Sequence, residues 1–469
     1  MTDEYDVIVI GAGPPGENAA GRCADGGLRV AIVEERLVGG ECSYYACIPS
    51  KTLIRPGDVL ASARRVPGAA EAVTGRIDLA AALARRDYMT SNWMDEGALN
   101  WLDSEGIDLV RGHGRLAGER TVEVERDGES PRRLTARRAV VVACGSTPAV
   151  PPIEGLREAK PWDNRDATAV KELPRTFLVL GGGAVGVEMA QAFKRLGTEE
   201  VTLIEGGPHL LAREEPFAGE EVAAAFRDEG INVITGAKVT AARRDRPDGP
   251  VTVVLDDGRE LTGEELLVAV GRRPHTNDLG LETVGLQDLT GKYLGVDERL
   301  RVKGVDGDWL YAVGDCAGLA LLTHMGKYQG KIAGDVILGR DVEDLADYGA
   351  VSRVTFTDPQ VGAVGLTEAE AREKGIDVHT ARTNIADVPG AYVQGDGISG
   401  TAQLIVDRSR GVVVGATFTG PDVQEMVHAA SIAIVGEVPV ERLRHAVPAF
   451  PTVSEVWLHL VEELTGAET

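Results

Sequence analysis

Residues 5–35 read YDVIVIGAGPPGENAAGRCADGGLRVAIVEE, and this stretch decides the fold. An apolar run, a glycine turn, an alanine-rich segment and a Gly-Gly break lead to a second apolar run, which predicts a strand, a helix and a second strand. Gly11, Gly13 and Gly16 form G-x-G-x-x-G at the turn, where the chain can bend tightly and a pyrophosphate can approach the helix N-terminus. Glu34 ends the second strand, where a carboxylate accepts hydrogen bonds from a ribose. The stretch therefore predicts a dinucleotide-binding βαβ unit.

Residues 176–205, TFLVLGGGAVGVEMAQAFKRLGTEEVTLIE, repeat the same order of elements, so the chain is expected to bind two nucleotides. The repeated glycines are Gly181, Gly183 and Gly186, and the terminal acid is Glu205. A carboxylate there binds a 2′-hydroxyl and repels a 2′-phosphate by like charge, which favours NADH over NADPH. NADP(H) stays possible if the loop brings Arg213 back to compensate.

Length and charge narrow the class of protein. A chain of 469 residues exceeds a single core and predicts two to four domains. The formal net charge of −24 opposes binding to nucleic acid or to an anionic membrane. The first apolar run is too short for a signal peptide, and no run approaches the roughly 20 apolar residues of a membrane span. We expect a cytoplasmic enzyme with a small-molecule partner, no nucleic-acid partner and no membrane partner.

Cys42 and Cys47 lie in residues 38–51, VGGECSYYACIPSK, and are close enough in sequence to share chemistry. On a regular helix a separation of five residues corresponds to a rise of about 7.5 Å, which is too long for a disulfide. A redox pair therefore requires a distorted backbone at a turn or helix start, and Gly39, Gly40 and Pro49 make that distortion plausible. A helix N-terminus would also lower the pKa of a thiol.

The alternative for these two cysteines is a pair of buried thiols or half of a zinc site. No further Cys/His cluster completes such a site, so no metal is expected. Cys23, Cys144 and Cys316 are each expected to be a single, small, buried thiol.

Together the glycine loops and the cysteine pair resemble the flavoprotein pyridine nucleotide-disulfide oxidoreductases, which include dihydrolipoamide dehydrogenase, glutathione reductase, mercuric reductase and the soluble transhydrogenase. The resemblance covers nearly the whole chain. It extends to VVACGSTP (141–148), GRRPHT (271–276), LYAVGDCAG (310–318), VTFTDPQVGAVGLTEAEA (354–371) and FPTVSE (450–455).

The resemblance implies an α/β fold with two Rossmann-like domains, for FAD and NAD(P), and an α+β C-terminal dimerisation domain. The FAD domain would comprise residues 1–150 and 274–347, the NAD(P) domain 151–273, and the dimerisation domain 348–469. The proline-rich segment 148–155 suits a crossover between domains. Each subunit of the implied homodimer would complete the other's active site.

The resemblance also implies roles for individual residues. Lys51 would lie near the flavin ring N5 and pair with Glu188, where a cation stabilises negative charge on reduced flavin. Cys47 would be the charge-transfer thiol and Cys42 the exposed interchange thiol. Asp315 would hold the ribityl chain. The implied FAD-binding residues of the first loop are Gly11, Gly13, Gly16 and Glu34, and the further cofactor-binding positions are Gly40, Gly145, Gly271 and Gly314.

The chain departs from this family at the position of the catalytic base. Thiol-handling members have His-Pro-Thr where this chain has Phe450 followed by Pro and Thr, although Glu455 is retained. General acid–base catalysis contributes roughly 10²–10⁴-fold, so efficient dithiol chemistry needs a substitute base. His445 is one candidate, and a surface or core histidine is the alternative.

The segment around the cysteines also departs from the family. Tyr44 and Tyr45 replace smaller residues, and they either shape a flat acceptor site or pack. Glu41 replaces a threonine and is expected to disfavour a neighbouring thiolate.

The resulting hypothesis is an FAD-dependent NADH oxidoreductase with a redox-active Cys-x4-Cys pair. It passes electrons to a quinone-like or other acceptor that does not need a histidine base. The alternative is a dihydrolipoamide-dehydrogenase-like enzyme that uses a substitute base, and a third is a redox-sensing or scaffold dimer that keeps FAD for structure. The extra cysteine pair of mercuric reductases is not expected, since residues 457–469 read WLHLVEELTGAET.

Overall fold

The computed structural model describes residues 3–346 and 349–466. It divides into two compact units. The first comprises 1–49, 87–149 and 271–348, and the second comprises 50–86, 150–270 and 349–469. Helix α3 (Cys47–Arg64) begins in the first unit and continues in the second. No helix in the described ranges is long and apolar enough to cross a membrane.

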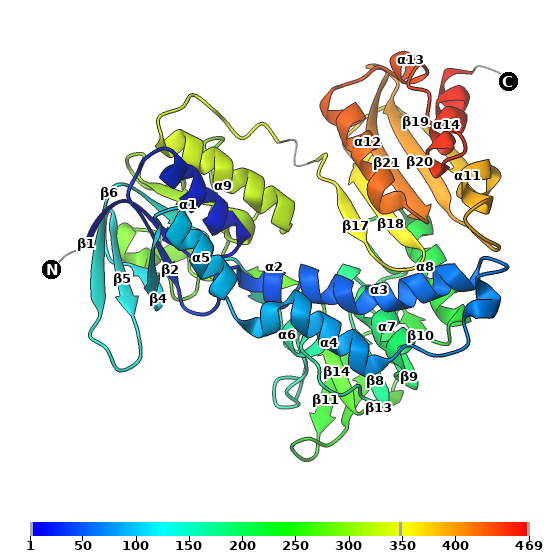
Figure 1. Cartoon of the computed structure of the whole chain (residues 1–469), viewed down its shortest axis with the longest axis horizontal. Helices are drawn as coiled ribbons and strands as arrows, with labels where there is room; N and C mark the ends of the chain where they lie inside the picture. The colour runs from blue at the N-terminus through cyan, green and yellow to red at the C-terminus, as the bar shows by residue number, and fades with distance from the viewer. Residues whose placement is uncertain (1–2, 347–348, 467–469) are drawn as a thin grey trace. The chain divides into compact units, whose positions relative to one another are not determined.

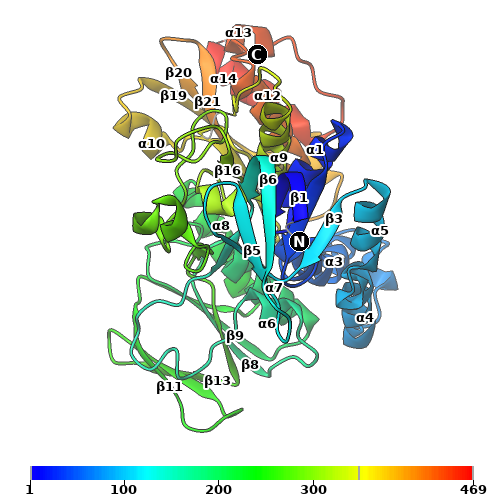
Figure 2. The ribbon, with the colours of Figure 1, turned by 90° about the vertical axis from the view of Figure 1, so that its left-hand side faces the viewer.

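The first unit is built on a seven-stranded sheet in which β3-β2-β1-β6-β5-β4 are neighbours and β16 also pairs with β6 (Figure 2). β1 runs parallel to both β2 and β6, and β6 runs parallel to β16. The carboxyl ends of these four strands therefore meet at one edge of the sheet. The strands of this unit are β1 (Asp3–Ile10), β2 (Val30–Glu34), β3 (Asp108–Arg111), β4 (His113–Leu116), β5 (Thr121–Glu125), β6 (Arg132–Val142), β7 (Ser146–Pro148), β15 (Arg272–Pro274) and β16 (Leu310–Ala312).

Small residues let the helices of the first unit approach closely. Helix α1 (Pro14–Asp25) packs against α9 (Thr323–Ile337). A Cβ added at Gly330 of α9 would lie 2.3 Å from the Pro15 carbonyl oxygen of α1, so only glycine fits there. Helices α2 (Gly40–Tyr44) and α5 (Glu96–Ser104) complete the helices that lie wholly in this unit.

The second unit begins with a four-stranded parallel sheet in the order β10-β9-β8-β14. A three-stranded antiparallel sheet, β11-β12-β13, lies in the chain between β10 and β14 of the parallel sheet. The strands are β8 (Thr176–Leu180), β9 (Glu200–Glu205), β10 (Asn232–Thr235), β11 (Val239–Arg244), β12 (Val251–Leu255), β13 (Glu260–Gly263) and β14 (Glu265–Val268). The helices are α4 (Leu79–Met89), whose last three residues belong to the first unit, α6 (Asn164–Thr168), α7 (Ala184–Leu196) and α8 (Pro216–Asp228).

The C-terminal part of the second unit is a five-stranded antiparallel sheet in the order β17-β18-β21-β20-β19 (Figure 1). α12 packs on β18 and β21, and α14 packs on β19. The strands are β17 (Arg353–Thr355), β18 (Gln360–Gly365), β19 (Val378–Asn384), β20 (Thr401–Asp407) and β21 (Val412–Gly420). The helices are α10 (Glu368–Glu373), α11 (Pro389–Tyr392), α12 (Val423–Val435), α13 (Val440–Leu443) and α14 (Val456–Thr465).

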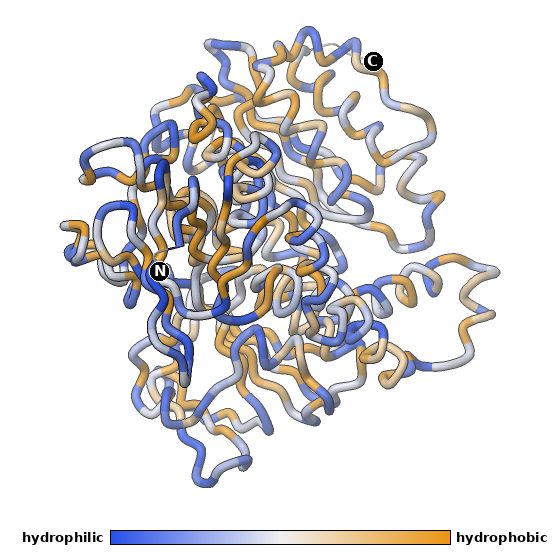
Figure 3. The backbone as a smooth tube through the Cα atoms, turned by 60° about the vertical axis from the view of Figure 1, so that its left-hand side comes forward, coloured by the Kyte–Doolittle hydropathy of each residue, from blue (hydrophilic) through white to orange (hydrophobic). Residues whose placement is uncertain are grey.

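The predicted fold class is confirmed: two βαβ units lie in an α/β chain that ends in an α+β part. Their core strands are apolar, and Figure 3 colours them mainly as hydrophobic, while projecting loops are mainly hydrophilic. The compact units divide at 149/150, 270/271 and 348/349. Residues 50–86 lie in the second unit, whereas the sequence analysis placed them in the segment 1–150.

Candidate functional site

The first glycine loop lies where β1 meets α1. Gly11 has φ +101°, and a Cβ at Gly16 would lie only 2.0 Å from the Gly11 carbonyl oxygen. Gly13 is the N-cap of α1 and offers no side-chain cap; because Pro14 and Pro15 have no N–H, the N–H groups that can face an anion at this helix end are those of Gly13 and Gly16. The Glu34 carboxylate accepts backbone N–H groups of Ala12 at 2.8 Å and Arg36 at 2.7 Å, which fixes it beside the loop. This geometry fits the pyrophosphate and ribose of a dinucleotide.

The second glycine loop repeats this geometry between β8 and α7. Gly181 has φ +110°, and a Cβ at Gly186 would lie 1.8 Å from the Gly181 carbonyl oxygen. Gly183 is the N-cap residue of α7 and, having no side chain, makes no side-chain hydrogen bond to the helix N-terminus. The Glu205 carboxylate accepts the N–H groups of Gly182 and Gly207, each at 2.6 Å. The second loop therefore fits a dinucleotide as the first does.

The two cysteines meet across a break in helical structure. Cys42 lies in α2, the C-cap residue Tyr45 has φ −137°, and Cys47 is the first residue of α3. The predicted distortion is confirmed. The structure has all five cysteines of the chain as thiols. The Cys47 sulfur also lies 3.5 Å from the Thr323 hydroxyl, at the start of α9.

The pKa of the Cys42 thiol is raised because it hydrogen-bonds to the Cys47 sulfur and because it is partly buried. This direction is opposite to the lowering that we expected from a helix N-terminus. The hydrogen bond to Cys47 and burial raise the pKa even though Cys42 lies in the first turn of the short helix α2. A hydrogen bond donated by Cys42 stabilises a thiolate on Cys47.

Arg272 offsets the negative charge of Glu41 next to the first cysteine. Its Nη2 lies 3.5 Å from the Glu41 carboxylate, and its Nε donates to the Ser146 hydroxyl at 2.6 Å and lies 3.8 Å from the Asp315 carboxylate. Ser146 in turn donates to Asp315. The expected penalty of Glu41 on a thiolate is therefore reduced. Neither Arg272 nor Ser146 was among the predicted site residues, although they lie in the motifs GRRPHT and VVACGSTP.

Tyr44 packs and does not form an acceptor site. Its side chain is buried, and its hydroxyl donates to the Val38 carbonyl at 3.0 Å. Tyr45 is half-buried, with its ring centre 6.4 Å from that of Tyr44. Of the two tyrosines, only Tyr45 has an exposed surface that a small molecule can reach.

Lys51 and Glu188 form the expected ion pair in the second unit. The Lys51 Nζ lies 2.6 Å from Glu188 Oε2, and the Glu188 side chain is only 4 % exposed. The other oxygen of Glu188 accepts the Phe356 backbone N–H at 2.9 Å. The Lys51 ammonium lies over the Phe356 ring, with Nζ 4.9 Å from the ring centre, so Phe356 contacts both partners of the pair. No sequence pattern indicated this role for Phe356.

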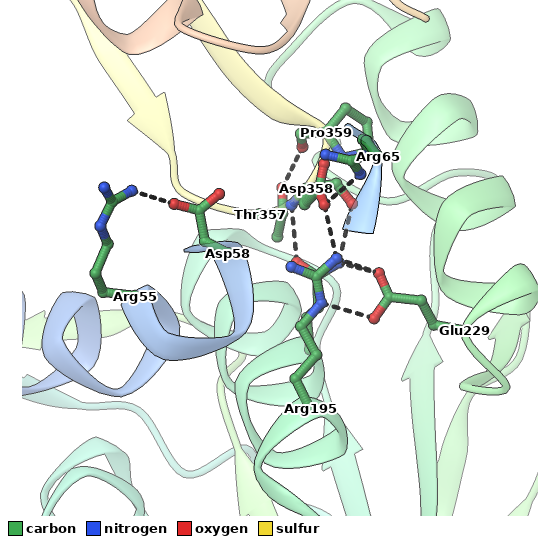
Figure 4. A network of polar contacts seen from close by, with 9 residues as sticks. Arg55, Asp58, Arg65, Arg195, Glu229, Thr357, Asp358 and Pro359 are labelled. Carbon is green, nitrogen blue, oxygen red and sulfur yellow. Dashed lines mark hydrogen bonds and ion pairs between the residues drawn. The ribbon is translucent and has the colours of Figure 1, made fainter. Parts of the chain in front are cut away.

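A polar network holds the segment that carries Phe356 (Figure 4). One turn after Glu188 on α7, the Gln191 side chain accepts the Asp358 N–H at 2.8 Å and donates to its carbonyl at 2.9 Å. Arg195 binds both Glu229 (2.6 Å) and the Asp358 carboxylate (2.8 Å). Burial opposes ionisation of Asp358, but Arg195 and Arg65 outweigh it and lower the pKa of that carboxyl. These contacts fix residues 356–358 to α7.

In the C-terminal motif, Phe450 occupies the position where a histidine base was expected. Phe450 is 72 % exposed, and His445 is exposed as well. Glu455 Oε2 is buried, and it has no hydrogen-bond partner among the described residues. Glu455, the carboxylate expected to orient a histidine, is thus retained, while Phe450 stands at the position of that histidine.

The remaining predicted cofactor positions lie in turns with left-handed backbone, where glycine is favoured. The φ values are +60° for Gly40, +71° for Gly145, +133° for Gly271 and +75° for Gly314. Gly40 approaches the first glycine loop, since a Cβ there would lie 2.6 Å from the Gly13 Cα. Gly145 and Gly314 adjoin Ser146 and Asp315, so the first unit gathers these positions around one sheet edge.

Comparisons with known proteins agree with this geometry. Residues 5–330 match the pyridine nucleotide-disulphide oxidoreductase family, and residues 351–461 match its dimerisation domain. The chain is 32 % identical to dihydrolipoyl dehydrogenase of Bacillus subtilis over 471 residues, covering 99 % of this chain and 97 % of the relative. It is 30 % identical to mercuric reductase of Lysinibacillus sphaericus over 455 residues, covering 97 % of this chain and 81 % of the relative.

Two solved structures resemble the whole chain. The Cu(II) complex of the HOCl-induced flavoprotein disulfide reductase RclA from Escherichia coli has a TM-score of 0.86 at 27 % identity, and covers 99 % of this chain and all of that one. LpdA from Mycobacterium tuberculosis has a TM-score of 0.84 at 26 % identity, with the same coverage. The chain belongs to the pyridine nucleotide-disulphide oxidoreductase family and is an FAD-dependent oxidoreductase.

Proposed function

We propose that this protein is a cytoplasmic, homodimeric NADH-dependent reductase that delivers electrons to a quinone-like or other acceptor that does not need a histidine base. FAD binds the loop of Gly11, Gly13 and Gly16, and NADH binds the loop that ends at Gly186. Bound FAD supplies the chemistry that accepts hydride from NADH and releases electrons to the acceptor. The FAD domain comprises 1–150 and 274–347, the NAD domain 151–273, and the dimerisation domain 348–469.

The observation that carries this proposal is Phe450 at the position of the base. A phenyl ring moves no proton, and the buried Glu455 oxygen has no described imidazole to orient. Reduction of a disulfide or oxidation of a dithiol needs protons to move at sulfur, whereas a quinone accepts electrons and takes its protons from water. Losing general acid–base catalysis therefore slows the reaction of thiol substrates by roughly 10²–10⁴-fold and spares a quinone.

The Lys51–Glu188 pair supports a role in electron transfer. The buried Glu188 carboxylate holds the Lys51 ammonium at 2.6 Å, and the Phe356 ring restricts where the ammonium points. A fixed cation stabilises negative charge that gathers on the bound cofactor. A protein that holds FAD only for structure has no need of such a pair.

The Glu205 geometry supports the preference for NADH. Two backbone N–H groups at 2.6 Å fix the Glu205 carboxylate beside the loop, where a carboxylate repels a 2′-phosphate by like charge. Arg213 is exposed and has no ion-pair partner among the residues that the structure describes.

Exposed apolar side chains in the dimerisation domain support the homodimer. Ile432, Val435 and Val447 are 57–75 % exposed, as is Phe450 at 72 %. Light scattering coupled to size-exclusion chromatography tests this part: a monomeric mass would contradict it.

The decisive experiment compares NADH oxidation by the wild type, Cys42→Ser and Phe450→His, with matched flavin content, against menadione and against lipoamide. We expect the wild type and Cys42→Ser to reduce menadione at similar rates and to use lipoamide poorly. Phe450→His restores an imidazole next to Glu455 and should raise lipoamide turnover at least about tenfold.

Efficient lipoamide turnover by the wild type would contradict the proposal. In that case His445→Gln identifies the substitute base, because it would abolish lipoamide turnover and spare menadione reduction. Loss of all turnover in Cys42→Ser would instead make the cysteine relay obligatory.

A further inference from the structure

Cys144 and Cys316 form a second pair of neighbouring thiols, which corrects the expectation that each is a single buried cysteine. β6 and β16 run side by side in parallel, with Val142 opposite Ala312 at their carboxyl ends. Cys144 follows β6 by two residues. The 3-10 helix η5 (Gly314–Ala317) turns the chain after β16, so that the Cys316 sulfur lies 3.4 Å from the Val142 carbonyl oxygen. The Cys144 thiol hydrogen-bonds to this sulfur.

The surroundings of the two sulfurs differ. Cys316 is fully buried, whereas Cys144 keeps partial exposure. The Cys144 thiol and the Gly145 backbone N–H both donate to the Cys316 sulfur, and these hydrogen bonds outweigh burial and lower the pKa of Cys316. The pKa of Cys144 is raised because it is the donor in the pair and because it is desolvated. The two sulfurs are thus in hydrogen-bond contact with each other, and the Cys316 sulfur also lies within reach of the Val142 and Val313 carbonyl oxygens, at 3.4 and 3.3 Å.

We propose that Cys144 and Cys316 are a second redox-active dithiol, separate from Cys42 and Cys47, which hydrogen peroxide closes to a disulfide. One sulfur attacks a peroxide oxygen, the O–O bond breaks, and a sulfenic acid and one water form. The other sulfur displaces the sulfenic oxygen, which leaves as a second water. The two S–H bonds are replaced by one S–S bond, and the two electrons lost by the thiols reduce one peroxide to two waters.

The disulfide joins two turns that carry cofactor-site residues. Ser146 lies two residues after Cys144, and Asp315 directly precedes Cys316. The Ser146 hydroxyl donates to Asp315 and accepts from Arg272 at 2.6 Å. A bond between the turns restricts how far they can separate. It should therefore slow the release of FAD and raise the thermal midpoint of unfolding, because the cross-link also constrains the unfolded chain.

The test uses the FAD-loaded wild type, treated with hydrogen peroxide, denatured with an alkylating agent and digested with trypsin. Cleavage after Lys and Arg places Cys42 and Cys47 in one peptide, 37–51, but Cys144 and Cys316 in separate peptides, 139–157 and 304–327. We expect the last two to appear as one cross-linked species, two hydrogens lighter than their sum. Dithiothreitol should separate them, and the peptide with Cys23 should stay alkylated.

Cys144→Ser and Cys316→Ser are the matched variants, and Cys23→Ser is the control that keeps the pair. Peroxide should raise the thermal midpoint by several degrees and slow FAD release at least twofold in the wild type, in Cys23→Ser and in Cys42→Ser, but in neither pair variant. Full alkylation of Cys144 and Cys316 after peroxide treatment would overturn the disulfide. A cross-link that leaves FAD release unchanged would contradict the claim that the disulfide holds the two cofactor-site turns together. Neither readout depends on the proposed electron acceptor.

Discussion

The two βαβ units use the same backbone device but differ in the helix that follows it. In both units the third glycine of the loop touches the carbonyl oxygen of the first, and the acid at the end of the second strand is held by backbone N–H groups. The helices already differ in their first two residues, Pro14-Pro15 in α1 and Ala184-Val185 in α7, and after the third glycine α1 has Glu17 where α7 has Val187. The loop geometry is therefore common to both units, while the residues that follow it differ.

A second difference between the helices is that a side chain of α7 forms an ion pair with another helix. At the next position α1 has Asn18, whose side chain donates to the Pro14 carbonyl of its own helix at 2.8 Å. α7 has Glu188 there, which reaches out of its helix to Lys51. One residue type at one position thus links α7 to α3, and α1 has no corresponding contact through Asn18.

The largest expected effect comes from disrupting the close approach between the first and third glycines, which both loops share. Gly16→Ala or Gly186→Ala places a methyl group within about 2 Å of a carbonyl oxygen, so the loop must open at a cost of several kcal/mol. We expect Gly16→Ala to be recovered without FAD, and Gly186→Ala to retain FAD but lose reduction by NADH. Absorbance spectra and NADH titration measure both.

Gly13→Ala and Gly183→Ala are the matched controls for this prediction. An added Cβ has open space at Gly183 and only ordinary contacts at Gly13. Both variants should keep the thermal stability of the wild type within about 1 kcal/mol. If Gly16→Ala behaves like Gly13→Ala, the tight contact is not essential to the loop.

The next effect concerns the Lys51–Glu188 ion pair, for which Asn18 of α1 forms no counterpart. Glu188→Gln leaves Lys51 without its counter-charge, so the ammonium is less firmly held. We expect the rate at which NADH bleaches the flavin absorbance to fall by about 10–100-fold, which corresponds to roughly 1.4–2.7 kcal/mol. Stopped-flow absorbance measures this rate. Asn18→Ala, at the matching position of α1, should change it less than twofold, and an equal loss in both variants would remove the contrast between the units.

Glu17 predicts a pH effect that is specific to the first unit. Burial is the main cause that raises its pKa from an ordinary 4.5 to about 7; Glu34 adds to the shift and Lys327 opposes it. Between these two pH values the folded protein binds more protons than the unfolded chain. The free energy of unfolding therefore falls as the pH rises through this window, by about 1–3 kcal/mol in all.

Glu17→Gln should remove this decrease in the free energy of unfolding with rising pH. Its thermal midpoint should exceed that of the wild type above about pH 7 and converge with it near pH 4.5. Val187→Gln, at the matching position of α7, should show no such pH dependence. An identical pH profile for Glu17→Gln and the wild type would contradict the prediction.

The smallest effect concerns nucleotide choice. Glu205→Gln removes the charge but keeps an oxygen for one of the two backbone N–H groups, and it should raise kcat/KM for NADPH relative to NADH about tenfold, or 1.4 kcal/mol. Steady-state kinetics with menadione provide the ratio. Arg213→Gln is the control: if it alone lowers NADPH use, the arginine compensates for the acid as the sequence analysis allowed.

Features that depend on local spacing could be predicted from the sequence. The glycine loops, their terminal acids and the break between Cys42 and Cys47 each involve residues within one turn or one βαβ unit. The pairing of Lys51 with Glu188 was also expected, but only through the family resemblance, because the two residues are far apart in the chain.

Features that depend on packing could not be predicted. Thr323 beside Cys47, Arg272 beside Glu41, and Phe356 under Lys51 come from segments with no common periodicity. Residues from strand ends that lie side by side come together only when the order of strands in the sheet is known.

The sequence by itself determined the two glycine loops, their terminal acids and the close spacing of Cys42 and Cys47, because each follows from residue type at short spacing. The loss of the histidine base was expected only through the family resemblance. Only the tertiary structure decided that Cys144 and Cys316 touch. Parallel pairing of β6 with β16 brings together residues that the chain separates by more than a third of its length. Sheet order depends on the packing of the whole unit, and no local pattern encodes it.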